Sequence, residues 1–358
     1  MTSRTYLRLA GLTAFVALAA ALAPFGYKAL AQSAAMPQGG AMPQGGGGYG
    51  QAAADVPMAS VTDPPGLPPD PTHITVLLPD QITWTGNEAL LYGTPTKPGD
   101  PYGLLVKLNP GEFSTPHTLA TDRWVFVISG TLWVSSGATF DPKSTYPVTG
   151  DNFVTNLAKT VFWDGNRAGA TEPTTLFISG VGSADNHIMG EYSKKVTVSV
   201  NDPAGPAPDT SHITIKAVAT TGNPDLYGGG QGATTEGTPY GVVQTWVAGR
   251  SSSPHYHPTP RYIYVLKGPW WVSSSTIHDV RLTYPVPTGS FVQDLPHGVH
   301  WDGNRAGADY TTRLYITGVA PATNHGVDVY GKDLPPGRGG PGGRGGSGRG
   351  GRGGPAPE

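Results

Sequence analysis

Four histidines in the last third of the chain carry its clearest signal for chemistry. His255 and His257 are two residues apart, and His297 and His300 follow in a later segment. Residues two apart on an extended strand point to the same face, so two of these imidazoles can face one ion and a third can complete the site. The chain has no cysteine, so any metal must be held by nitrogen and oxygen atoms. The pattern predicts a site for one divalent transition metal.

The chain repeats itself, and four matching blocks have the same offset of 138 residues. The matching blocks are Pro101-Tyr-Gly with Pro239-Tyr-Gly, Trp133-Val-Ser-Ser with Trp271-Val-Ser-Ser, Thr145-Tyr-Pro-Val with Thr283-Tyr-Pro-Val, and Trp163-Asp-Gly-Asn-Arg-Ala-Gly-Ala with Trp301-Asp-Gly-Asn-Arg-Ala-Gly-Ala. A constant offset indicates two copies of one fold without internal insertions.

The composition favours β structure throughout the body. Among 358 residues, 52 are Gly and 36 are Pro, which disfavours long helices. Short aromatic and β-branched runs, such as residues 124–128 and 262–266, lie between turn residues and predict strands. The net charge of −2 gives no general attraction to nucleic acid. We therefore expect two small all-β domains.

The two ends have a different character. Residues 1–31 predict an export signal, because Arg4 and Arg8 precede an apolar run that is too short to span a bilayer comfortably. An uncleaved N-terminal anchor is the alternative. Residues 32–70 predict a Gly/Pro-rich linker and residues 334–358 a Gly/Arg-rich tail, neither with enough apolar surface to fold. The tail arginines could meet RNA, lipid head groups or cell-wall anions, or could only aid solubility. The predicted location is periplasmic or secreted.

The second copy resembles the cupin superfamily, whose first motif reads G-x5-H-x-H-x3,4-E-x6-G and whose second motif ends in H-x3-N. The residues that stand at these spacings are Gly249, His255, His257, Gly268, His300 and Asn304. The resemblance implies an all-β fold of two tandem cupin-type jelly-roll β-barrels, and the composition adds disordered Gly/Pro-rich ends. The barrels would cover residues 71–195 and 205–333.

Two departures from the cupin pattern affect the predicted site. Arg261 stands where the family usually carries a metal-binding glutamate, and a guanidinium cannot ligate a metal. We expect Arg261 to orient a substrate anion or to be held by a nearby acid such as Asp294; a purely architectural role is equally open. The second motif is one residue shorter than usual, so His297 is an alternative to His300 as the third ligand.

The first copy serves as an internal comparison. His117 and Arg123 match His255 and Arg261, but Leu119 stands in place of the second histidine. Lys159 and Phe162 stand in place of His297 and His300. One imidazole cannot make the site, so we expect the first barrel to be degenerate and metal-free.

These features lead to two principal hypotheses. In the first, His255, His257 and His300 bind Fe, Mn, Ni, Cu or Zn, and the protein is an oxygenase, isomerase or lyase acting on a small anionic molecule. In the second, the pair of barrels is a non-catalytic ligand-binding or surface-assembly protein. Metal-free acid–base catalysis by His255 ranks below both. No nucleic acid partner and no stable membrane span after signal cleavage are expected; a homo-oligomer is compatible with the sequence.

Overall fold

The computed structural model describes residues 59–185 and 191–335. The predicted export signal, most of the predicted linker and the tail from residue 336 lie outside the described residues. Within the described ranges the chain forms strands and three short 3₁₀ turns but no α-helix. The turns are η1 (Pro142–Ser144), η2 (Gly230–Gly232) and η3 (Val280–Leu282). The predicted all-β fold class is therefore confirmed.

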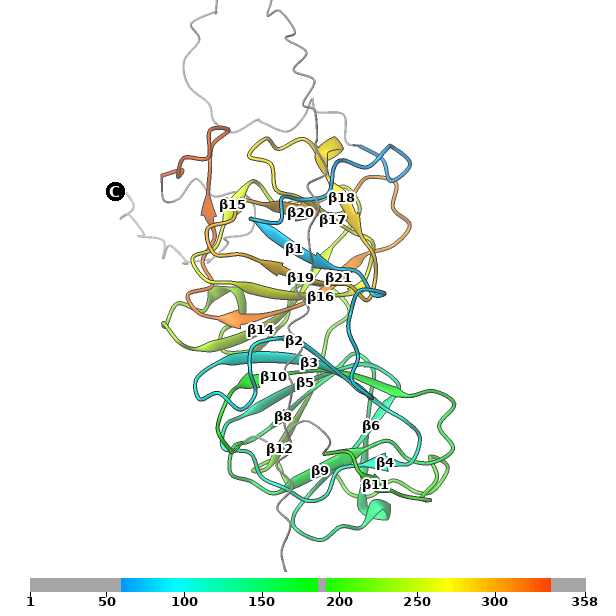
Figure 1. Cartoon of the computed structure of the whole chain (residues 1–358). Helices are drawn as coiled ribbons and strands as arrows, with labels where there is room; N and C mark the ends of the chain where they lie inside the picture. The colour runs from blue at the N-terminus through cyan, green and yellow to red at the C-terminus, as the bar shows by residue number, and fades with distance from the viewer. Residues whose placement is uncertain (1–58, 186–190, 336–358) are drawn as a thin grey trace, which may run out of the picture. The chain divides into compact units, whose positions relative to one another are not determined.

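Two antiparallel sheets build the first barrel (Figure 1). The larger has the strand order β12 (Ile213–Ala217), β8 (Asn152–Asn156), β5 (Arg123–Ser129), β10 (Thr174–Val181), β3 (Pro101–Leu108) and β2 (Glu88–Tyr92). The smaller has the order β11 (Lys194–Lys195), β4 (Glu112–Phe113), β9 (Phe162–Gly165), β6 (Thr131–Ser136) and β7 (Tyr146–Thr149).

The second barrel repeats this arrangement with smaller sheets opposite the large one. The large sheet has the order β1 (Ile74–Leu77), β19 (Phe291–Asp294), β16 (Arg261–Lys267), β21 (Thr312–Val319), β14 (Pro239–Trp246) and β13 (Asp225–Tyr227). A three-stranded sheet contains β18 (Tyr284–Val286), β17 (Trp270–Ser273) and β20 (Trp301–Gly303), and a two-stranded sheet contains β15 (His255–Tyr256) and β22 (His325–Gly326).

Strict alternation along the strands separates the barrel interiors from the contact between the barrels. In β5, Val125 and Val127 belong to the core of the first barrel, whereas Phe126 between them belongs to a cluster shared by both barrels. In β16, Ile263 lies in the core of the second barrel and Tyr262 in the shared cluster. Because successive side chains point to opposite faces, each large sheet fills its own barrel with one face and packs on its sister with the other.

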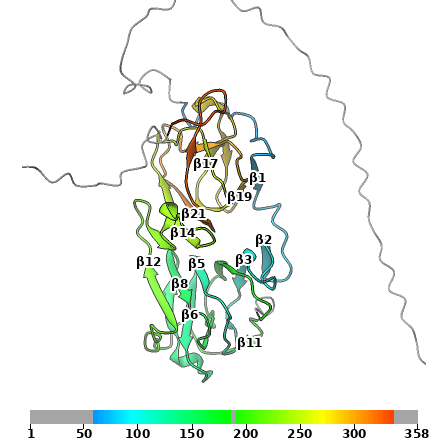
Figure 2. The same ribbon diagram turned by 90° about the vertical axis from the view of Figure 1, so that its left-hand side faces the viewer.

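Each large sheet takes its outermost strand from the other half of the chain. Strand β1, which precedes the first barrel in sequence, pairs with β19 of the second, as Figure 1 shows. Strand β12, which precedes the second barrel, pairs with β8 of the first (Figure 2). The predicted boundaries at residues 71 and 205 group each of these strands with the barrel that follows it in sequence, whereas the strand pairing places it in the other barrel. The exchange links the two barrels through backbone hydrogen bonds.

Residues 59–70, which the sequence places in the linker, lie against the second barrel. The buried guanidinium of Arg305 explains this, because it donates to the carbonyl oxygens of Asp63 at 3.0 Å and Pro64 at 3.2 Å. It also donates to Thr283 and stacks on the ring of Trp271 at 3.9 Å. Residues 59–70 therefore need few apolar side chains to stay on the barrel, because one arginine satisfies several of their backbone carbonyl groups at once.

The first barrel has the same arrangement of an arginine that binds backbone carbonyls and stacks on a tryptophan. Arg167 donates to the carbonyl oxygens of Asp202 and Pro203 at 3.0 and 3.1 Å and stacks on Trp133 at 3.8 Å. Both arginines belong to the repeated Trp-Asp-Gly-Asn-Arg block. The block is therefore a structural element that fastens the segment preceding each exchanged strand.

Replacing Arg305 by glutamine is expected to lower the free energy of unfolding by about 2–4 kcal/mol, because several buried carbonyl groups lose their donor. Proteolysis should also begin at residues 59–70. Chemical denaturation and limited proteolysis test this. The matched control is Arg281→Gln, since the side chain of Arg281 is 67% exposed and its ion pair among the described residues is with Asp279; this variant should behave like the parent protein. Equal stability of the two variants would contradict the proposed anchoring.

Candidate metal centre

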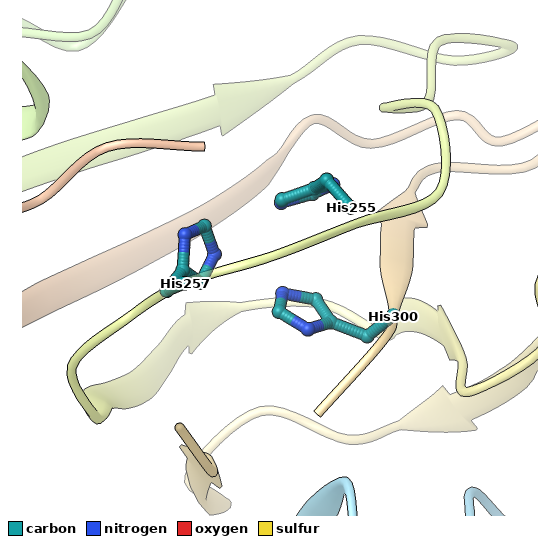
Figure 3. Close-up of side chains that lie close together, drawn as sticks. All are labelled: His255, His257 and His300. Carbon is teal, nitrogen blue, oxygen red and sulfur yellow. The ribbon is translucent and has the colours of Figure 1, made fainter. Parts of the chain in front are cut away.

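Three imidazoles converge in the second barrel from two segments that lie side by side (Figure 3). His255 and His300 face each other across a β-bridge in which each backbone N–H donates to the other's carbonyl oxygen at 2.8 Å. His257 follows two residues after His255 and turns its ring to the same side. The ring centroids are 4.6–4.9 Å apart, and one donor nitrogen from each ring lies within 4.8 Å of the others.

The hydrogen bonds of the three rings determine which nitrogen is free. Each Nδ1 lies at hydrogen-bonding distance from a backbone carbonyl: His255 from Ser253 at 2.7 Å, His257 from Thr323 at 3.1 Å, and His300 from Gly298 at 2.9 Å. A carbonyl oxygen can only accept, so Nδ1 carries the proton and Nε2 has the lone pair. The Nε2 atom of His257 is buried and has no hydrogen-bond partner among the described residues. This donor set fits a transition metal, which binds deprotonated ring nitrogens whose other nitrogen is hydrogen-bonded.

Burial keeps the three rings neutral. Their exposed fractions are 7% for His255, 1% for His257 and 3% for His300. Burial, with smaller effects from neighbouring groups, lowers the pKa of His255 to about 3 and that of His300 to about 4, and it lowers the pKa of His257 well below its ordinary value. Neutral imidazole is the form that ligates a metal, so the folded site does not have to lose protons first.

The exchanged strand helps to present the third imidazole. His73, directly before β1, has its Nδ1 2.9 Å from the carbonyl oxygen of Val299, and its own carbonyl accepts from the N–H of Leu295 at 2.9 Å. Gly298 passes so close that a Cβ there would lie 2.6 Å from the carbonyl oxygen of His73. The turn that leads into His300 is thus held by a residue from the other half of the chain.

His297, the alternative third ligand, is exposed and lies outside the group formed by the other three. Its backbone has a positive φ of 61°, and its ring packs beside Tyr256 with the centroids 5.2 Å apart. Of the two candidates, the structure brings His300 into the group.

Arg261 lies at the start of β16 and is 4% exposed. Its Nη2 donates to the carbonyl oxygen of Ala322 at 2.6 Å and to Oδ1 of Asn324 at 2.8 Å. The carbonyl of Thr323, in the same segment, is the partner of His257. Arg261 therefore fastens the segment that orients one of the three imidazoles, and its Nε has no hydrogen-bond partner among the described residues.

In the first barrel, the corresponding position is occupied by a buried ionic cluster. Arg123, which is fully buried, donates to Glu191 at 2.5 Å and to Asp164 at 3.1 Å. His117 lies 3.6 Å from the same glutamate. Asp122, directly before this arginine, accepts from the N–H of Ala158 at 2.8 Å. In both barrels the arginine thus fastens a segment that follows the last long strand.

Asp294 is a member of the site that sequence reasoning named only as a partner for Arg261. Its Oδ2 lies 3.3 Å from Nε2 of His300. Burial raises the pKa of this carboxyl to about 7, while Arg261 acts in the opposite direction. The signal that could have found it is the repeat, because the residue 138 positions earlier is Asn156. The carboxylate occurs only in the copy with three imidazoles.

No protein-family model matches the chain, and no curated protein matches its sequence. Among solved structures, it is similar to a cupin 2 conserved barrel domain protein from Leptotrichia buccalis, with a TM-score of 0.45 and 11% identity, over 69% of this chain and 96% of that one. It is also similar to salicylate 1,2-dioxygenase from Pseudoaminobacter salicylatoxidans (TM-score 0.46, 12% identity, 71% of this chain and 84% of that one). A third similar structure is oxalate decarboxylase from Bacillus subtilis (TM-score 0.44, 11% identity, 72% and 79%).

Acid is expected to destabilise the metal-free protein. An unfolded imidazole takes up its proton near pH 6.5, whereas the pKa values of the three buried rings are lowered in the folded state. The unfolded chain therefore binds more protons below about pH 6.5, and the free energy of unfolding falls as the pH decreases. Asp294 has the opposite effect on the free energy of unfolding, because its pKa is raised. Protonation of this one carboxyl offsets the effect of only one of the three rings.

Thermal unfolding tests this in the metal-free protein, where the melting temperature should be lower at about pH 5 than at about pH 7. A double variant, His257→Gln with His300→Gln, should show a smaller difference because it lacks two of the titrating rings. A wild-type melting temperature that does not change over this range would contradict the buried, neutral state of the histidines.

Proposed function

We propose that the second barrel binds one divalent transition metal through the Nε2 atoms of His255, His257 and His300. The observation that carries this proposal is the convergence of three neutral, buried imidazoles whose Nδ1 atoms are all hydrogen-bonded to backbone carbonyls. Three Nε2 lone pairs directed at one another are unfavourable without a cation between them. Fe, Mn, Ni, Cu and Zn all accept such nitrogen ligands.

We further propose that the protein is an enzyme of oxygenase, isomerase or lyase type that acts on a small anionic organic molecule. A divalent ion held by three imidazoles keeps positions open for water, dioxygen or a substrate oxygen. The Nε–H of Arg261 is buried without a partner among the described residues, and so it can donate to a substrate anion. In this proposal His257 and Arg261 both depend on the segment 322–324 for their orientation.

Non-catalytic ligand binding is the second candidate function, and the burial of the site favours it. None of the three histidines is more than 7% exposed, and the segment that follows β21 lies against both His257 and Arg261. Oxygen uptake or product formation with a panel of small carboxylates, abolished by a chelator, would support the enzyme. Stoichiometric binding of one of these molecules without turnover would support the binding protein.

A location outside the cytoplasm, periplasmic or secreted, is also a proposal. It is supported by the charged and apolar pattern of residues 1–31. None of the helical segments in the described part is long and apolar enough to cross a membrane. N-terminal sequencing of the protein from cell fractions would test cleavage and export together.

The metal proposal predicts one ion per chain in the purified protein. His257→Ala should reduce the bound metal to a small fraction of this, because the site loses one of its three imidazole ligands. Elemental analysis of the full chain provides the measurement.

Two histidine variants serve as controls. His297→Ala removes an exposed imidazole next to the site, and His117→Ala removes the matching imidazole of the first barrel; both should keep one ion per chain. A wild-type protein without stoichiometric metal, or a His257→Ala variant with unchanged metal content, would contradict the proposal.

A further inference from the structure

Asp294 is a buried acid with one oxygen that no hydrogen bond satisfies. It ends β19 and pairs in register with Arg261 of β16 on one side and with Ile74 of the exchanged strand on the other. It is 4% exposed, and its Oδ1 has no hydrogen-bond partner among the described residues. A carboxylate oxygen left in this state costs free energy unless a cation or a proton compensates it.

The other oxygen of Asp294 faces a nitrogen that cannot donate to it in the neutral ring. Oδ2 lies 3.3 Å from Nε2 of His300, whose proton is on Nδ1 and is directed at Gly298. A carboxylate oxygen and an imidazole lone pair at this distance repel each other. The same separation is what two ligands of one ion require: donor atoms about 2.1 Å from an ion lie about 3.0 Å apart at a right angle and about 3.4 Å apart at the tetrahedral angle.

The first barrel shows how the same position behaves without a metal site. Asn156 is the counterpart of Asp294, and both pair in register with the arginine of the neighbouring strand. With its amide oriented to satisfy both atoms, the oxygen of Asn156 accepts from Nε and Nη2 of Arg123 at 3.0 Å. Arg261, in contrast, donates to Ala322 and Asn324. An amide thus suffices where the role is to hold the arginine, and the carboxylate at this position stands beside His300 in the copy that has three imidazoles.

Asp302 shows that a buried acid in this barrel need not be left unsatisfied. Its Oδ2 accepts from the indole N–H groups of Trp246 and Trp270, each at 2.9 Å, and its Oδ1 accepts from Ser252 at 2.8 Å. These bonds supply donors to both oxygens, so Asp302 is a structural acid. Asp294 has no comparable set of donors.

We infer that Asp294 is the fourth protein ligand of the metal and supplies the carboxylate that the position of Arg261 lacks. The inference rests on the proposed metal site and extends it from three ligands to four. Arg261 pairs in register with Asp294 and fastens the segment that orients His257, so its positive charge lies near the site and disfavours a cation there. A carboxylate bound to the ion compensates that charge.

The test compares Asp294→Asn with the parent protein in two measurements with opposite expectations. The affinity for Zn²⁺, measured by competition with a chromophoric chelator, should fall at least tenfold. The melting temperature of the metal-free protein should stay the same or rise, because the amide removes an uncompensated buried acid. A merely structural role would instead lower the metal-free melting temperature and leave the affinity unchanged. Asp279→Asn, a partly exposed acid of the same barrel that pairs with the exposed Arg281, is the matched control and should leave the affinity for Zn²⁺ unchanged.

The outcomes separate this inference from the proposed function. If the parent protein binds no Zn²⁺, the metal site itself is contradicted. If the parent binds it and Asp294→Asn binds it equally well, only the fourth ligand is contradicted. Should the variant not fold, the infrared difference spectrum of the parent with and without Zn²⁺ decides: a shifted carboxylate stretching band supports the inference, and a spectrum without one overturns it.

Discussion

The site in the second barrel depends on the burial of three imidazoles, which keeps water away from them and keeps them neutral. Each ring places one N–H on a backbone carbonyl, and these bonds fix both the orientation of the ring and the nitrogen that is left free. Two of these carbonyls lie two residues before the histidine they bind, and the third lies in the segment after β21. The backbone therefore sets the direction of the free nitrogen lone pairs. A site of this kind is costly to bury without an ion, which is why the acid and the arginine around it matter as much as the histidines.

The two halves of the chain are not independent supports for this site. Strand β1 is the neighbour of β19, which carries Asp294, and His73 holds the turn that leads to His300. The segment before β1 is fastened to the same barrel by Arg305. Residues from the start of the described chain therefore determine the geometry of ligands more than 200 positions later. In the first barrel the Nδ1 of the equivalent His212 lies 2.8 Å from the carbonyl oxygen of Val161, so the same support is present in the copy that lacks two of the three histidines.

Much of this could be predicted from local sequence. The repeat offset and the short aromatic and β-branched runs predict the β fold, and the spacing of His255, His257 and His300 predicts the convergence of the rings. Strand exchange could not be predicted, because the two copies share one pattern and the local sequence does not say which barrel β1 and β12 join. Asp294 belongs to no metal-binding spacing pattern; the repeat marks it as an acid that stands where the first copy has Asn156, but only its contact with His300 places it at the site. The anchoring of residues 59–70 depends on the distant Arg305, so their composition alone wrongly suggests that they do not fold.

The central claim is that one ion is held between the Nε2 atoms of His255, His257 and His300. Anomalous diffraction from crystals of the protein, recorded at the absorption edge of the metal found in it, tests this most directly. The account predicts a single strong peak about 2.0–2.2 Å from all three Nε2 atoms and no peak beside His117 in the first barrel. The absence of a peak among the three imidazoles in a metal-loaded crystal, or a peak elsewhere in the chain, would contradict it.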